Sequence, residues 1–180
     1  MNAASPPRSA LRHRLFLTWA VGGVLLLFAN AVRRVGPIAL EPLRQGWPGW
    51  RLAAAYAGSV GLMGFGMGYQ GLHKQFAPRV VVRAWVMADR RVGPWVTLLA
   101  PLASMGLVHG TRRRVIASWT MIGSMVGALV AVRILGQPWR GVVDAGVVVG
   151  LAWGMAAILL LALRAARGEL PPTDPELPAG

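Results

Sequence analysis

Asp144 is the acidic residue closest to a long apolar stretch of the chain, and basic residues surround it in the sequence. Acidic side chains inside membrane-spanning segments usually carry a function, such as a proton or ion relay. We expect Asp144 in the first turn of the last helix, where the helix N-terminus stabilises negative charge. The sequence predicts an ion-pair site of Arg133, Trp139, Arg140 and Asp144. The favoured interpretation is a salt-bridged helix start that fixes a hairpin, and a relay or anion site is the alternative.

Two histidines end the second and third apolar stretches, at His73 and His109. Two imidazoles that face each other across a helical bundle can hold a haem. Both histidines lie at the edges of the stretches, near basic residues, rather than inside them. We therefore interpret them as surface residues and predict no cofactor and no metal. A haem- or quinone-associated membrane anchor that uses His73 and His109 is the alternative.

The residue combinations that catalysis requires are missing from the sequence. The chain has no cysteine, which excludes disulfides, thiolate metal sites and a cysteine nucleophile. It contains no H-E-x-x-H, no G-x-S-x-G and no phosphate-binding loop motif. Its six acidic residues form no close pair at membrane depth. We therefore expect no catalytic residues and a protein that is not an enzyme.

The apolar residues gather in blocks of membrane-spanning length. Of the 180 residues, 55% are hydrophobic and 14% are charged, whereas soluble domains carry about a quarter charged residues. Five stretches of 18 to 21 residues contain no charge: 15–32, 52–72, 92–110, 115–132 and 145–163. A bilayer core is crossed by about 20 apolar helical residues. The sequence therefore predicts an all-α, polytopic membrane helical bundle, with no segment long enough for a separate soluble domain.

The number of predicted spans is four or five. The stretch 92–110 contains Pro94 and Pro101, so it is either a kinked full span, which we favour, or a broken re-entrant hairpin. Cytoplasmic loops are enriched in Lys and Arg. Four spans place 13 of these residues on one side and 6 on the other, with both termini cytoplasmic, whereas five spans place 10 and 9. The charge distribution thus favours four spans, and the lengths of the stretches favour five.

Arginines alternate with the apolar blocks and give the chain a net charge of +13. This alternation is typical of topology determinants and lipid-headgroup contacts, and we predict no nucleic acid partner. In the loop 71–91, the spacing of the arginines predicts an interfacial helix over 79–91, although a solvated helix end has the same pattern. The predicted headgroup contacts are Arg79, Arg83, Arg90, Arg112, Arg113 and Arg114.

Glycines spaced by four residues predict close packing between helices. Membrane helices associate through small residues, because apolar side chains gain little by leaving lipid for one another. Three segments carry such a seam: Gly146, Gly150 and Gly154 in the last, Gly123 and Gly127 in the one before it, and Ala53, Ala57 and Gly61 in the second. Packing within the bundle is the favoured interpretation, and docking of a partner subunit is the alternative.

The predicted organisation is a basic disordered tail over 1–13, one integral membrane domain over 14–166 and a Pro-rich disordered tail over 167–180. A cleaved signal peptide ending at 29–31 is a disfavoured alternative for the first stretch. We expect the chain to be a bacterial, multi-pass inner-membrane protein. Its expected role is that of a non-enzymatic accessory or assembly subunit that packs against other membrane subunits or itself. A small oligomeric transporter or channel is the main alternative.

Overall fold

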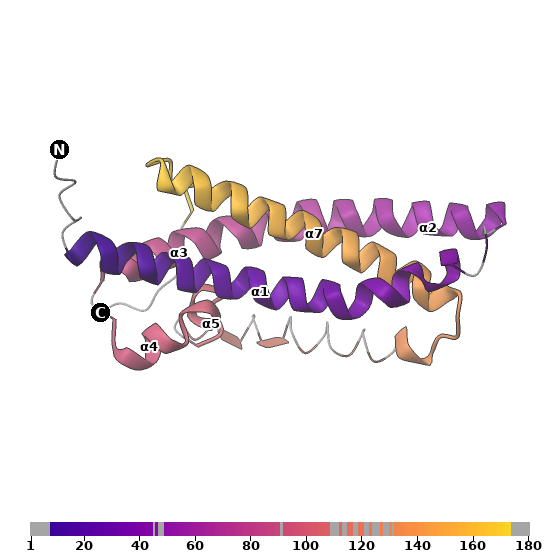
Figure 1. The fold of residues 1–180 in the computed structure, drawn as a ribbon, viewed down its shortest axis with the longest axis horizontal. Helices are drawn as coiled ribbons and strands as arrows, with labels where there is room; N and C mark the ends of the chain where they lie inside the picture. The colour runs from indigo at the N-terminus through magenta and orange to yellow at the C-terminus, as the bar shows by residue number, and fades with distance from the viewer. Residues whose placement is uncertain are drawn as a thin grey trace.

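The computed structural model is an elongated bundle of helices (Figure 1). The structure describes residues 8–44, 46, 49–90, 92–108 and 132–173, together with the single positions Arg112, Val115, Ile116, Trp119, Thr120, Gly123, Gly127 and Val130. All secondary structure in this part of the chain is helical, which confirms the predicted all-α class.

Helix α1, Arg8–Arg44, runs along most of the length of the molecule (Figure 1). Its 37 residues correspond to about 55 Å at 1.5 Å per residue, well beyond the thickness of a bilayer core. The sequence places the start of the first helix at 14 and the end of its apolar stretch at 32. The observed helix begins earlier and continues through Arg33 and Arg34, because charged side chains end an apolar stretch without ending a helix.

The last turns of α1 contain Pro37 and Pro42. Proline has no backbone N–H, so each of these residues removes one hydrogen bond from the helix. The Tyr56 hydroxyl donates a buried hydrogen bond of 2.9 Å to the Ala39 carbonyl in the same region. This hydrogen bond ties α2 to the proline-containing end of α1.

The chain then continues as one helical rod from Trp50 to Asp89, and the last part of this rod packs against α1. The rod consists of α2, Trp50–Met63, the π-helix η1, Gly64–Phe76, and α3, Ala77–Asp89. The backbone keeps helical dihedral angles at Gly64 and Phe76, where one type of winding changes into the next. The predicted span 52–72 thus forms only part of a longer helical segment.

Helix α3 is packed inside the bundle and does not lie on its surface. Val80, Ala84 and Met87 are almost fully buried and belong to the main apolar cluster, which also contains residues of α1 and α7. Arg83 has 0% exposure. The prediction of an interfacial helix over 79–91 is therefore wrong for this element. Apolar residues surround α3 on most sides, so the helix packs against several neighbours at once.

The segment after this rod forms two short helices, α4, Pro94–Leu98, and α5, Ala100–Ser104. The helix is interrupted at Leu99 (φ −91°, ψ 19°), so the predicted continuous span 92–110 is wrong over its described part. The alternative of a broken helix agrees with the structure. Proline is tolerated in the first turn of a helix but not in its interior, which explains the restart just before Pro101.

Neighbouring tryptophans donate hydrogen bonds to two carbonyls around the broken segment. The Trp19 indole N–H donates to the Leu98 carbonyl at 3.2 Å, and the Trp119 indole N–H donates to the Leu107 carbonyl at 3.2 Å. Backbone groups outside regular helix need such partners where water is scarce. The broken helix is thus anchored from α1 and from Trp119.

Helix α7, Trp139–Ala166, runs antiparallel to α1 and packs against α1, α2, η1 and α3. It ends at Ala166, the residue at which the sequence places the end of the helical domain. Helix α1 begins and α7 ends at the same end of the molecule (Figure 1).

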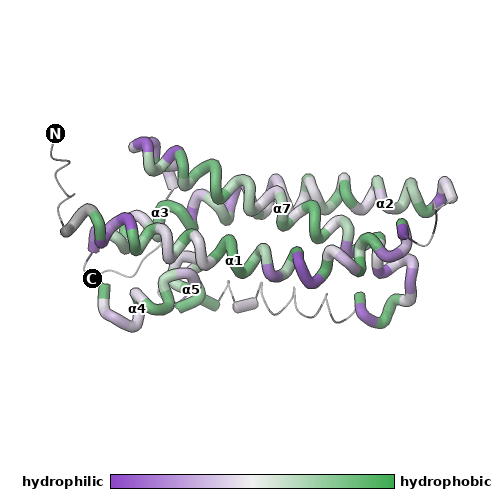
Figure 2. Tube along the Cα trace, viewed as in Figure 1, coloured by the Kyte–Doolittle hydropathy of each residue, from purple (hydrophilic) through white to green (hydrophobic). Residues whose placement is uncertain are grey.

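Two helical segments of the described chain are long and apolar enough to cross a membrane, 11–44 and 139–166. Apolar residues lie along most of both helices (Figure 2). Only 28% and 33% of their most apolar windows are buried in the structure. The core helix of a soluble protein is mostly buried, so this exposure favours membrane association.

Candidate functional site at the start of α7

Asp144 is buried in the second turn of α7, with 4% of its surface exposed. The sequence places it in the first turn, but α7 begins five residues earlier, at Trp139. The favourable effect of a helix N-terminus on negative charge falls off within the first turn. Side chains near Asp144, rather than the helix end, must therefore compensate its charge.

Arg140 is the ion-pair partner of Asp144. Its Nε atom lies 3.7 Å from Asp144 Oδ2, and the arginine side chain is 30% exposed. The two residues are four apart in one helix, a spacing that brings their side chains together. At this distance the contact is an ion pair but not a direct hydrogen bond.

The other two residues of the predicted site lie apart from this pair. Arg133 and Trp139 are exposed, and in the described part of the chain neither has an ion pair or a hydrogen bond with Asp144. The structure thus brings together two of the four predicted residues.

Three residues that the sequence analysis missed complete the surroundings of the site. Gln137 donates from Nε2 to Glu41 Oε2 at 2.8 Å, and its Oε1 atom accepts a hydrogen bond from the Gly141 N–H at 3.2 Å. Gln137 therefore caps the start of α7 and joins it to α1. A polar residue just before a helix is a recognisable capping signal, but nothing in the sequence connects Gln137 with Glu41, 96 residues away.

The third missed residue is Tyr56, which lies where α1, α2 and α7 meet. A Cβ atom at Gly141 would stand 2.8 Å from the Tyr56 hydroxyl oxygen and 2.7 Å from Cγ of Pro42. The missing side chain of Gly141 therefore permits this three-helix contact, one turn before Asp144. Because the Tyr56 hydroxyl already donates to Ala39, its proton is engaged. The polar groups around Asp144 join three helices.

A second buried charged side chain belongs to α3, the last part of the rod. Arg83 of α3 is fully buried, and its guanidinium occupies the space where a Cβ at Gly106 would stand. Gly106 has φ +79°, a conformation that residues with side chains rarely adopt. The turn after α5 therefore needs glycine for two reasons, its backbone angle and its contact with Arg83. The prediction that Arg83 contacts lipid headgroups is wrong, because this side chain does not reach the surface.

The remaining predicted headgroup residues differ in their positions. Arg79 is half-buried, whereas Arg90 and Arg112 are exposed. Arg113 and Arg114 lie outside the described residues. Headgroup contact remains a prediction for the exposed arginines.

The two histidines are not shown to form a shared site. His73 is half-buried on η1, with its ring centroid 5.6 Å from that of Tyr69. His109 lies outside the described residues. Among the residues that the structure describes, no group of three His, Asp or Glu side chains could hold a metal ion.

The three glycines of α7 lie where this helix crosses α2 and η1. A Cβ at Gly146 would stand 2.8 Å from the Ser59 carbonyl oxygen, and one at Gly154 would stand 2.5 Å from Leu72 Cδ1. Gly150 lies against Gly68 and Met67. The α7 seam is therefore used inside the bundle. Gly123 and Gly127 are exposed, and no described atom lies within 4 Å of a Cβ built at either position.

Comparisons with protein-family models, curated proteins and solved structures find no match for this chain. Over its described residues the chain is all-helical, with two helical segments of membrane-spanning length.

Proposed function

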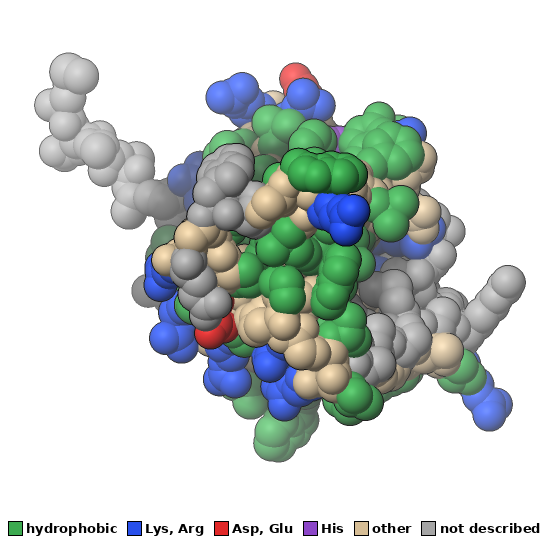
Figure 3. Space-filling view, turned by 90° about the vertical axis from the view of Figure 1, so that its right-hand side faces the viewer, with side chains coloured by type: hydrophobic (Ala, Val, Ile, Leu, Met, Phe, Trp, Pro, Cys, Tyr) green, Lys and Arg blue, Asp and Glu red, His purple; other side chains and the backbone are tan. Residues whose placement is uncertain are grey.

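We propose that this chain is a multi-pass integral membrane protein that acts without catalysis, as an accessory or assembly subunit for other membrane helices. The supporting observation is the outward exposure of large apolar side chains along α1, α2 and α7. Leu26 is 67% exposed, Leu62 76% and Leu159 50%. Apolar side chains also reach the surface between arginines at the end where α2 begins (Figure 3). Such an apolar surface is stable in contact with the hydrocarbon core of a bilayer.

The proposed topology has four spans with both termini in the cytoplasm. Three of the spans are the apolar parts of α1, of the rod from Trp50 to Asp89, and of α7, and the fourth is the apolar stretch 115–132. The break between α4 and α5 favours four spans over five, because the stretch 92–110 contains no continuous helix over its described part. The start of α1 and the end of α7 lie at the same end of the molecule (Figure 1). A chain with an even number of spans has both of its ends on one side of the membrane, so this position also agrees with four spans. The 13 to 6 distribution of basic residues then orients the protein.

The accessory role is supported by a small-residue surface on α2 that points away from the bundle. This surface consists of Ala54, Gly58 and Gly61, which are exposed and share one face of the helix. No described atom lies within 4 Å of a Cβ built at either glycine. Because the α7 seam is occupied, this α2 surface is where another helix can approach closely.

The absence of cysteine allows a direct test with single-cysteine variants. The chain is expressed in bacteria, and membranes are washed with alkaline carbonate before cross-linking. We expect the protein in the pellet, and a defined cross-linked product from Gly61→Cys but not from Leu26→Cys on α1. Protein in the supernatant would refute the membrane assignment.

The role of the α2 surface is tested separately by bulky substitutions. Gly58→Leu and Gly61→Leu should reduce the size of the assembly in mild detergent, while the amount of protein in the membrane stays the same. The matched control is Gly36→Leu on α1, where a Cβ also has no described atom within 4 Å. An unchanged assembly size in both α2 variants would refute the docking role and leave the membrane assignment intact.

A further inference from the structure

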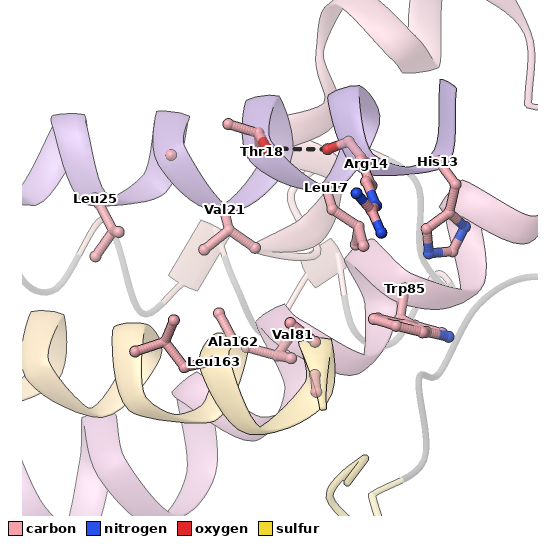
Figure 4. A pocket seen from close by; sticks show the side chains of 13 residues that line it. His13, Arg14, Leu17, Thr18, Val21, Leu25, Val81, Trp85, Ala162 and Leu163 are labelled. Carbon is pink, nitrogen blue, oxygen red and sulfur yellow. Dashed lines mark hydrogen bonds between the residues drawn. The ribbon is translucent and has the colours of Figure 1, made fainter. Parts of the chain in front are cut away.

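An apolar groove of about 600 Å³ runs between α1, α3 and α7 (Figure 4). Its walls are formed by Leu17, Val21 and Leu25 of α1, by Val81 of α3, and by Ala162 and Leu163 of α7. The three α1 residues are spaced by four, so they share one helix face. The volume falls within the range of small-molecule binding sites.

One end of this groove is polar and positively charged. Arg14, His13 and Trp85 gather there, while the other end is lined by apolar side chains alone (Figure 4). From Arg14 to Leu25 the helix rises about 16 Å at 1.5 Å per residue. The groove thus combines a charged mouth with an apolar channel, the shape of an amphiphile with one tail.

The contacts at the mouth leave Arg14 available for a ligand. His13 Nδ1 lies 2.9 Å from Asp89 Oδ1, and its ring meets Trp85 edge to face at 4.8 Å between centroids. Arg14 is exposed, and its guanidinium makes no ion pair or hydrogen bond with the residues that the structure describes. Asp89 is thus engaged by His13, whereas Arg14 has no partner for its guanidinium in the part of the chain that the structure describes.

We propose that this groove binds an acyl chain of an anionic phospholipid, with the phosphate at Arg14. Charge complementarity selects the anionic headgroup, because Arg14 is an exposed cation that lines the mouth and none of the described acidic residues lines the groove. Trp85 is suited to the boundary between headgroup and chain, where tryptophan is enriched in membrane proteins. The apolar walls select a hydrocarbon tail rather than a free phosphate.

This inference goes beyond the accessory role and depends only on access to lipid. It concerns a groove between α1, α3 and α7, whereas the docking surface lies on the outer face of α2. The lipid-binding test and the assembly-size test can therefore have different outcomes, and failure of one proposal does not imply failure of the other.

The test uses the full chain, purified in a neutral detergent and freed of lipid. Bound molecules are counted by native mass spectrometry during titration with lysophosphatidylglycerol, lysophosphatidylcholine or glycerol 1-phosphate. We expect lysophosphatidylglycerol to bind about fivefold more tightly than lysophosphatidylcholine, as one basic side chain near an anionic headgroup predicts. Glycerol 1-phosphate, which has the headgroup but no tail, should not bind. Equal affinity for the two lysolipids, or tight binding of glycerol 1-phosphate, would overturn the proposal.

Two variants separate the headgroup contact from the channel. Arg14→Gln should remove the preference for the anionic lysolipid, whereas Arg44→Gln at the other end of α1 should keep it. Gly22→Leu should fill the channel and lower the affinity for both lysolipids more than tenfold, because no described atom lies within 4 Å of a Cβ at Gly22. Gly36→Leu is its control on the same helix.

A second channel variant guards against a folding defect. Leu163→Trp on α7 narrows the groove from the opposite wall, at a side chain that is partly exposed. Wild-type lipid binding in both Gly22→Leu and Leu163→Trp would overturn the proposal. A loss of dimers in these variants, with lipid binding unchanged, would show that a second copy of the chain occupies the groove and would overturn it as well.

Discussion

Replacement of Gly146 by alanine should destabilise the protein, because this glycine lies against the backbone of α2. The added Cβ would stand 2.6 Å from Ser59 Oγ, 2.8 Å from the Ser59 carbonyl oxygen and 3.1 Å from Met63 Cβ. The hydroxyl can rotate away, but the carbonyl belongs to the helix backbone. To relieve the contact, α2 and α7 must move apart by several tenths of an ångström, which loosens their packing at Gly150 as well.

The expected net effect follows from two opposing terms. Overpacking in a tightly packed region costs about 1–3 kcal/mol. Alanine in place of glycine inside a helix contributes about 1 kcal/mol of stability. We expect Gly146→Ala to lower the free energy of unfolding by up to about 2 kcal/mol, whereas helix propensity alone would raise it by about 1 kcal/mol.

The assay is reversible unfolding of the purified chain in mixed micelles of dodecyl maltoside and increasing dodecyl sulfate, followed by circular dichroism. The matched control is Gly58→Ala on the outer face of α2, where a Cβ meets no described atom within 4 Å. That variant should be as stable as the parent or slightly more so. Equal stability of Gly146→Ala and Gly58→Ala would refute the packing argument for the α7 seam.

Three further predictions concern the polar contacts, each measured by the same unfolding assay. Gly106→Ala should cost at least about 2 kcal/mol, because it combines a strained positive φ with a clash against Arg83. Tyr56→Phe should cost about 1 kcal/mol through the lost hydrogen bond to α1, and an unchanged value would show that this bond contributes nothing. Arg140→Gln should cost more than Asp144→Asn, since the first leaves a buried carboxylate without its partner, and the reverse order would contradict the ion pair.

Three of the five predicted apolar stretches, 15–32, 52–72 and 145–163, lie within observed helices, but the helix ends do not follow from the sequence. Arg33 and Arg34 end an apolar stretch, and the sequence analysis therefore ended the first span before them. The observed α1 continues for ten residues beyond Arg34. Hydropathy reports where a segment meets lipid, whereas backbone dihedral preferences decide where a helix stops, and arginine is a good helix former.

The error over α3 has a different physical cause. The spacing of Arg79, Arg83 and Arg90 by four and seven residues places them on one helix face and predicts a charged outer face, but spacing alone does not show which neighbours surround the helix. In the structure the turn at Gly106 meets this face and covers Arg83. That contact joins segments more than twenty residues apart, so no local sequence pattern predicts it.

The candidate site shows the same division between local and distant contacts. The Arg140–Asp144 pair was predictable because both residues belong to one helix at a spacing of four. The contacts of Gln137 with Glu41 and of Tyr56 with Ala39 join separate helices, so they depend on how the bundle packs. Single-sequence reasoning could find the charge that must be compensated but not all of the groups around it.

The packing of α7 changes where a partner helix should be sought. The sequence singled out the three glycines of this helix as the strongest seam, and each of them lies against α2 or η1. A partner that approached the same face would have to displace these elements. The exposed glycines of α2 require no such displacement, because nothing among the described residues covers them. If the chain assembles with other membrane helices, substitutions on α2 should therefore weaken the assembly and leave the fold intact, whereas substitutions in the α7 seam should weaken both.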